Sequence, residues 1–251
     1  MKTKITSGRM FELTFQTFGL HFNYIISLAA IFIAITFFLG FWAESFNETE
    51  PDMAGALLFM ALLVAVYAKL AVMIHRLVIL GEKGIGLVFS WSLKELKFIG
   101  WILMFVAAAY AVLFVLLQLL AKMLISSGTG MMTLVTLLII IGLGALFSRV
   151  ALVFPAAAAD HRSSVKHAWE LSANNKLSLF FLVVVVPYIT GRILDRLPDD
   201  QLIWVLLGGV ISVFVLIFEV ALLSHCYEAL IGTDDAETED DLNVETITEE
   251  I

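Results

Sequence analysis

The sequence is short of charge and of cysteine, and each shortage excludes a class of protein. Charged residues make up 15% of the 251 positions and hydrophobic residues 61%, with a mean hydropathy of +0.97. Soluble domains carry about 25% charged and about 45–50% apolar residues, so a water-soluble globular domain is excluded. Cys226 is the single cysteine, which excludes an internal disulfide. The chain is therefore predicted to be an integral membrane protein.

What the sequence has in abundance is long apolar runs. A helix of about 20 residues crosses a hydrocarbon core of about 30 Å, and six runs are long enough. They predict an all-α polytopic membrane bundle of six transmembrane helices, called spans 1 to 6 here, at about Asn23–Ala43, Met53–Ile74, Phe98–Leu120, Met131–Phe154, Leu177–Leu194 and Leu202–Ile231. Span 1 is too long for the apolar core of a signal peptide and lacks a convincing cleavage site, so we interpret it as a retained helix.

The basic residues lie mostly on one side of the predicted spans. That side, with the adjoining span ends, holds twelve Lys and Arg, and the other side holds three. Since positive residues gather in cytoplasmic loops, both termini are predicted to be cytoplasmic, with the spans in the cell inner (plasma) membrane. The segment 232–251 holds nine acids, no base and no aromatic residue, and is predicted to be a disordered cytoplasmic tail after a single transmembrane domain of residues 1–231.

Each basic-side segment that precedes a hairpin of spans carries an apolar stripe at helical spacing. The first runs from Phe11 to Phe22, the second lies around Trp91, and the third lies around Trp169. A helix lying in the headgroup layer needs such a stripe, so three cytoplasmic interfacial amphipathic helices are predicted. The even spacing of Phe15, Trp91 and Trp169 fits three repeats of an interfacial helix plus a helical hairpin. The alternative is that any six-span chain with amphipathic links shows this pattern.

Among the ionisable residues inside the predicted spans, Lys69, Arg149 and Glu219 lie at a similar depth. At 1.5 Å per residue each lies about 24–27 Å from the outer end of its span, near the cytoplasmic interface. Two interpretations are open. Either Glu219 forms an interhelical ion pair with Arg149 and Lys69, or the three side chains reach headgroups and water separately.

The polar link between spans 4 and 5 concentrates groups that can carry chemistry. Asp160, His161, His167 and Glu170 match no recognised zinc spacing, so no metal, cofactor or catalytic residue is assigned. Asp160 is instead expected to cap the third interfacial helix.

Four residues of this link and the start of span 5 are candidates for contact with lipid headgroups. They are Arg162, Lys166, Lys176 and Trp169. Cations are attracted to anionic lipid, and tryptophan is enriched at the membrane–water interface. The expected partner is membrane lipid, with another membrane protein as the second candidate and no nucleic acid. The sequence does not fix an oligomeric state.

The same link resembles a known group of proteins. Its residues read Arg149-x-x-Leu152-x-x-Pro155, then an acidic residue, then Ser-x-x-x-Ala-Trp-x-Leu-Ser, with Asn174-Asn175 before span 5. This pattern is similar to the YciC-type uncharacterised bacterial inner-membrane proteins and to the related membrane domain attached to some glycerophosphodiester phosphodiesterases. The resemblance implies a multi-pass inner-membrane protein without an assigned activity. It transfers no phosphodiesterase activity, because the catalytic domain of those enzymes is a separate soluble barrel.

The sequence therefore predicts a non-enzymatic multi-pass protein that binds lipid or a partner membrane protein through a basic cytoplasmic collar. Nucleophile motifs such as G-x-S-x-G are absent. The alternative is a transporter or channel for a small or amphipathic solute, with a path between repeat units. A polar cavity that reaches the middle of the membrane near Tyr110, Gln118, Tyr188 and Thr190 would favour this alternative.

Overall fold

The computed structural model describes residues 4–47, 53–124, 129–198 and 201–249, and within these ranges it consists of helices, turns and links without a strand. The six apolar segments that can cross a membrane are Phe22–Ala43, Met53–Leu80, Leu93–Leu116, Leu134–Ala158, Lys176–Leu194 and Ile203–Gly232. They overlap all six predicted spans, so the predicted all-α polytopic membrane bundle is confirmed. The helices that carry them are α2 (Phe22–Asn47), α3 (Met53–Leu80), α4 (Leu93–Leu124), α5 (Thr129–Val150) with α6 (Val153–Ala158), α8 (Lys176–Phe180) with α9 (Val186–Leu194), and α10 (Leu202–Glu249).

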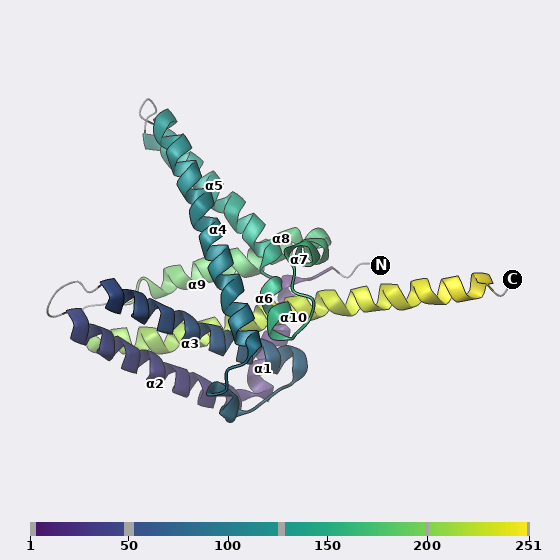
Figure 1. Cartoon of the computed structure of the whole chain (residues 1–251), viewed down its shortest axis with the longest axis horizontal. Helices are drawn as coiled ribbons and strands as arrows, with labels where there is room; N and C mark the ends of the chain where they lie inside the picture. The colour runs from purple at the N-terminus through teal and green to yellow at the C-terminus, as the bar shows by residue number, and fades with distance from the viewer. Residues whose placement is uncertain (1–3, 48–52, 125–128, 199–200, 250–251) are drawn as a thin grey trace.

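The helices divide into a packed group and a projecting hairpin (Figure 1). α10 packs against α2, α3 and α9, and also against α1 (Ser7–Leu20). The hairpin of α4 and α5 leaves this group at a steep angle, and an 18-residue window of α4 contains no buried residue. Lipid tails solvate leucine as well as another helix does, so such a hairpin is stable in a membrane without dense packing.

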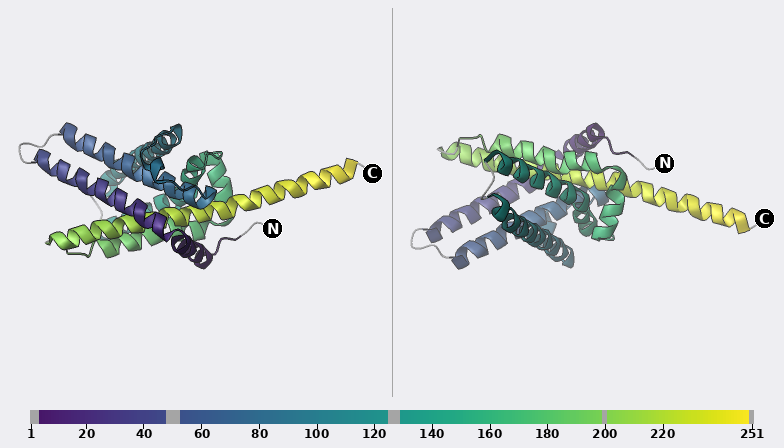
Figure 2. Two further views of the ribbon diagram at one scale, coloured as in Figure 1. Left: turned by 90° about the horizontal axis from the view of Figure 1, so that it is seen from below. Right: turned by 90° about the horizontal axis from the view of Figure 1, so that it is seen from above.

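Both termini lie at one end of the packed group, as Figure 2 shows from two sides. The link 81–92, α1 and α7 (Val165–Leu171) lie toward the same end. We call it the basic end, because most of the Lys and Arg residues lie there. A buried cluster of α2, α3 and α10 side chains, including Leu28, Ile74 and Ile217, joins the three helices below it.

Two of the three expected interfacial helices are present. α1 sets the rings of Phe11, Phe15 and Phe18 around Phe218 of α10, with ring centroids 5.2–5.9 Å apart. Part of the predicted phenylalanine stripe therefore packs on protein, although Phe15 stays 64% exposed. α7 is the third interfacial helix, and its buried side is formed by Ala168 and Leu171.

The prediction of a second interfacial helix is wrong. Residues Ile85–Val88 form a short 3-10 turn, and Trp91 lies in the extended link before α4. Gly81 has a φ of 65°, a left-handed conformation that ends α3 and that other residues rarely adopt. The three glycines of this link, Gly81, Gly84 and Gly86, weaken helix formation further. The proposed repeat therefore lacks a helix in its middle unit.

Two prolines coincide with breaks in the helices that carry spans 4 and 5. Pro155 has no N–H and its ring clashes with the carbonyl four residues earlier, so α5 ends at Val150 and the chain resumes as α6. The carbonyl oxygen of Ala151 accepts instead from the Phe154 N–H at 3.0 Å. In span 5 a π turn, Phe181–Val185, comes just before Pro187 and separates α8 from α9.

The prediction that Asp160 caps α7 is also wrong. The N-cap residue is Ser164, whose Oγ accepts from the His167 N–H at 3.2 Å. Asp160 has a φ of 61° and ends α6, where the His161 N–H donates to the Ala156 carbonyl oxygen at 2.9 Å. This is the left-handed position that closes many helices.

α10 extends to Glu249, past the expected end at Ile231, so the acidic segment is helical where the sequence predicts disorder. This part projects beyond the other helices (Figure 1). An isolated helical segment in water is of marginal stability.

Candidate functional site

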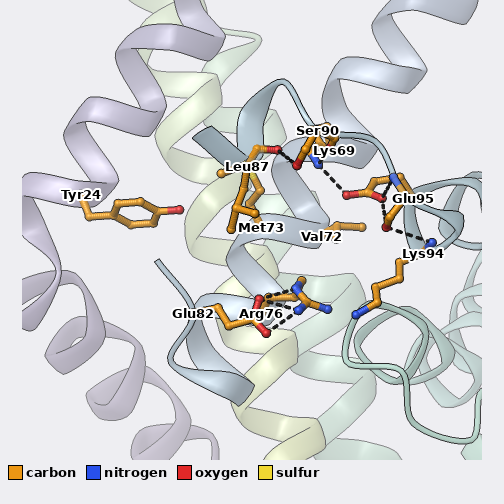
Figure 3. Close-up of a pocket in the computed structure, with 11 residues that line it drawn as sticks. Tyr24, Lys69, Val72, Met73, Arg76, Glu82, Leu87, Ser90, Lys94 and Glu95 are labelled. Carbon is orange, nitrogen blue, oxygen red and sulfur yellow. Dashed lines mark hydrogen bonds and ion pairs between the residues drawn. The ribbon is translucent and has the colours of Figure 1, made fainter. Parts of the chain in front are cut away.

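Two cavities with charged walls lie at the basic end. The first, which we call the link cavity, has a volume of about 190 Å³ and lies between α2, α3 and the link 81–92 (Figure 3). The second, the N-terminal cavity, has a volume of about 510 Å³ and lies between the N-terminal segment, α1 and α10. They differ in how their charges are satisfied.

In the link cavity, Lys69 is enclosed by groups from the link and from α4. Its Nζ donates to Glu95 Oε1 and to the Ser90 carbonyl oxygen, each at 2.5 Å, and lies 5.7 Å from the centre of the Trp91 ring. Glu95 Oε2 accepts from the N–H of Ser92 at 2.7 Å and from its hydroxyl at 2.5 Å. Ser92 and Glu95 thus form a capping box at the start of α4, to which Lys69 adds a buried charge.

A second ion pair closes the opposite wall of the link cavity (Figure 3). The Arg76 guanidinium donates to both carboxylate oxygens of Glu82, with the Nε–Oε2 distance at 2.8 Å, and also donates to the Ala158 carbonyl oxygen at 3.1 Å. On the rim, Lys94 Nζ lies 2.6 Å from Asp160 Oδ2. Each cation of this cavity is therefore paired with an acid of the protein, and the pairs hold the link against α3 and α6.

The predicted ion pair among Lys69, Arg149 and Glu219 is wrong, because each of the three has another partner. Lys69 pairs with Glu95, and the carboxylate of Glu219 lies 2.7 Å from Thr190 Oγ1. Glu95 was missed because it lies three residues before the predicted start of span 3. The S-x-x-E pattern of Ser92–Glu95 ahead of an apolar run is a signal that could have found it.

Arg149 joins α5 to α7. Its guanidinium carbon lies 3.4 Å from the centre of the Trp169 ring. Its Nη2 donates to the Trp169 carbonyl oxygen at 2.8 Å, and its Nε donates to Ser172 Oγ at 3.1 Å. The polar link between spans 4 and 5 is thus fastened by an arginine that stacks on an aromatic face.

The predicted lipid-contact residues lie at the surface of the basic end. Arg162, Lys166 and Lys176 are exposed, whereas Trp169 is 39% exposed and Arg149 covers one face of its ring. Lys166 lies 3.9 Å from Glu170, and both side chains are largely exposed. Arg162 and Lys176 form no ion pair with any described residue.

The N-terminal cavity is formed by a contact that the sequence did not predict. The Ile5 N–H donates to Asn175 Oδ1 at 2.7 Å, and Ser178 Oγ donates to the Ile5 carbonyl oxygen at 3.0 Å. These bonds fix the segment before α1 against the start of span 5, although about 170 residues separate them in the sequence. Lys4 and Arg9 then line the cavity, are exposed, and have no ion pair within the described ranges.

The far wall of the N-terminal cavity contains one acid and one histidine. His225 Nε2 lies 2.9 Å from Thr17 Oγ1, and its Nδ1 lies 3.4 Å from Glu228 Oε2. Thr6, the N-cap residue of α1, makes no side-chain cap hydrogen bond, and the first turn of α1 has no acid. The positive end of the α1 dipole therefore adds to the two cations.

Other polar residues at the basic end join helices to one another. His75 Nδ1 lies 2.7 Å from Ser224 Oγ, and His161 Nδ1 lies 3.1 Å from the Tyr227 hydroxyl. In the part of the chain that the structure describes, no three His, Cys, Asp or Glu residues are placed to hold a metal ion.

The fold defines the class of this chain, which is a multi-pass membrane protein. Comparison with protein-family models, with curated proteins and with solved structures found no match. The resemblance of the 149–175 stretch to YciC-type proteins therefore stays a prediction.

Proposed function

We propose that this chain is a non-enzymatic membrane protein that binds anionic phospholipid headgroups at its basic end. The observation that supports this proposal best is the N-terminal cavity, where Lys4 and Arg9 line a volume of about 510 Å³ without an acid partner among the described residues. We further propose that the basic end faces the cytoplasm of an inner-membrane protein of the YciC type. The positive-inside bias of the links supports this orientation.

The walls of the N-terminal cavity suit an amphipathic ligand. Lys4 and Arg9 offer charge to a phosphate, while Met10, Leu13 and Val78 offer apolar surface to the glycerol backbone and the first carbons of the chains. Glu228 stands on the far wall with His225 and disfavours a ligand that fills the whole cavity with negative charge. A phosphodiester headgroup of a single negative charge fits this distribution better than a polyanion.

Other exposed cations of the basic end extend the same attraction. Arg162 and Lys176 are exposed and have no acid partner within the described residues, and Lys176 follows the Asn175 that holds Ile5. A cation near an anionic lipid surface contributes about 1 kcal/mol, so a cluster of cations gives measurable selectivity over neutral lipid.

Native mass spectrometry from mild detergent, with added phosphatidylglycerol or phosphatidylcholine, tests the proposal. The double variant Lys4→Gln, Arg9→Gln is expected to bind the anionic lipid about 30-fold more weakly, which corresponds to about 2 kcal/mol for two cations. The matched control is Lys83→Gln, Lys97→Gln. It removes the same charge from exposed residues that also lack an ion pair in the described structure and do not line the cavity.

Equal loss of anionic lipid in both double variants would mean that net charge and not the cavity attracts lipid. Equal binding of the two lipids by the wild-type protein would contradict headgroup recognition altogether. A stable protein partner in place of lipid in the spectra would favour the second candidate, an accessory subunit.

A further inference from the structure

Glu219 is an acid inside a membrane span, and it does not line either cavity of the basic end. It is half-buried and stands in a groove of about 250 Å³ between α10 and the π turn of span 5. The other residues that line this groove are apolar, among them Leu182, Val183, Pro187 and Leu216. A charged or ionisable group in such surroundings is costly and by default suggests a function.

The carboxyl group of Glu219 lies within the length of its span, away from the basic end. At 1.5 Å per residue, Glu219 is about 20 Å along α10 from Gly232, the basic end of that span. Thr190, which touches the carboxyl, is about 21 Å from Lys176, the basic end of span 5. Helical side chains lean toward the N-terminus of their helix, which in α10 is the end away from the basic side. Thr190 is about 6 Å from Leu194, the other end of span 5, so the contact lies inside the span and nearer the end away from the basic side. The expectation that Glu219 lies near the cytoplasmic interface is therefore wrong.

The hydrogen bonds around Thr190 indicate which form of Glu219 fits. Thr190 Oγ1 lies 3.2 Å from the Val186 carbonyl oxygen, 3.0 Å from that of Pro187 and 2.7 Å from Glu219 Oε1. The hydroxyl has one hydrogen to donate. The contact with Glu219 is the shortest, so the hydroxyl donates to Glu219 Oε1, and the second carboxyl oxygen has no hydrogen-bond partner among the described residues. A carboxylate with one donor in apolar surroundings is poorly stabilised, so the neutral acid fits better.

No charge in the groove offsets an ionised Glu219. Of the described residues, those that line the groove include no cation and no second titratable group. The charged side chains of α8, α9 and the described part of α10 lie outside it, and Arg192 is paired with Asp195 at 3.2 Å. An isolated carboxylate in apolar surroundings takes up a proton, because the ionised form is strongly destabilised by desolvation.

We propose that Glu219 is a proton-binding site within the membrane, a neutral carboxylic acid that accepts a hydrogen bond from Thr190 and is reached from the lipid through this groove. Thr190 is its positioning residue, since its hydroxyl donates to Glu219 Oε1. The site is separate from the proposed headgroup site, because the two cavities share no lining residue. The chemical class that it admits is a small apolar reagent that reacts with carboxylic acids.

Infrared spectroscopy in lipid nanodiscs at neutral pH tests the protonation. The wild-type protein is expected to show the C=O stretching band of a carboxylic acid, shifted in D2O, and Glu219→Gln is expected to lack it. Exposed carboxyl groups do not contribute, because they are ionised at this pH. In Thr190→Val the band is expected at a changed frequency, since the C=O group of the acid loses its hydrogen-bond donor. A wild-type spectrum without an acid band that depends on Glu219 would overturn the proposal.

Labelling with dicyclohexylcarbodiimide tests access from the lipid. The carboxyl O–H adds across one C=N bond of the reagent, the proton goes to nitrogen, and the adduct rearranges to a stable N-acylurea with no leaving group. Peptide mass spectrometry is expected to find the label on Glu219 in the wild-type protein, while a water-soluble carbodiimide labels exposed acids such as Glu170 and leaves Glu219 unmodified. Labelling of Glu219 by the water-soluble reagent alone would overturn the proposed route. Unchanged lipid affinity in Glu219→Gln is expected, which keeps this result separate from the proposed function.

Discussion

The two cavities at the basic end are built from the same residue types but use them in opposite ways. In the link cavity, Lys69 and Arg76 are paired with Glu95 and Glu82 and hold a loop in place. In the N-terminal cavity, Lys4 and Arg9 have no acid partner among the described residues and face an open volume. A cation at the basic end thus stabilises the fold where an acid of the protein pairs with it. Where no acid pairs with it, the cation is available to a ligand.

The largest expected effect is on the link cavity. Glu95→Ala leaves Lys69, whose side chain is 4% exposed, without its partner. Removing one member of a buried pair costs about 3–5 kcal/mol, because the remaining charge stays buried. The free energy of unfolding in mixed micelles is expected to fall by that amount. Lys69→Met with Glu95→Leu should recover most of the loss, and a double variant as unstable as Glu95→Ala would contradict the account.

A smaller effect is expected where the two halves of the chain meet at the N-terminal cavity. Asn175→Ala removes the acceptor of the buried Ile5 N–H, and an unsatisfied buried donor costs about 1–3 kcal/mol. Thermal unfolding should report this loss, and native mass spectrometry should show weaker anionic lipid binding because Lys4 is no longer held. Lipid binding at the wild-type level would show that the cavity does not depend on this contact.

The smallest effect is expected at the surface of α7. Lys166 and Glu170 lie 3.9 Å apart and are largely exposed, and such a pair contributes about 0.3–0.5 kcal/mol. Lys166→Ala should therefore change the free energy of unfolding several-fold less than Glu95→Ala does. A loss as large as that of the buried pair would remove the distinction between matched buried charge and solvated charge.

The sequence predicts the spans well, because an apolar run of the right length has few other stable forms in a chain of this composition. It predicts α1 and α7 because their apolar stripes have helical period. It fails at the link 81–92, where three glycines and two ion pairs override the stripe around Trp91.

The charged contacts of the basic end were less predictable than the spans, for a different reason. The predicted Lys69–Arg149–Glu219 group matched charges by depth alone, whereas the structure pairs Lys69 with the acid of a capping box and Arg149 with a tryptophan face. The N-terminal cavity depends on Ile5 and Asn175, which no local pattern connects. Contacts between such distant residues follow from packing and not from periodicity.

Photo-crosslinking with phosphatidylglycerol that carries a diazirine on its headgroup tests the central claim most directly. The account predicts adducts on the peptides that contain residues 4–13 and 225–232, reduced by Lys4→Gln with Arg9→Gln and unchanged by Lys83→Gln with Lys97→Gln. Adducts concentrated on residues 81–95, around the charge-matched cavity, would contradict it.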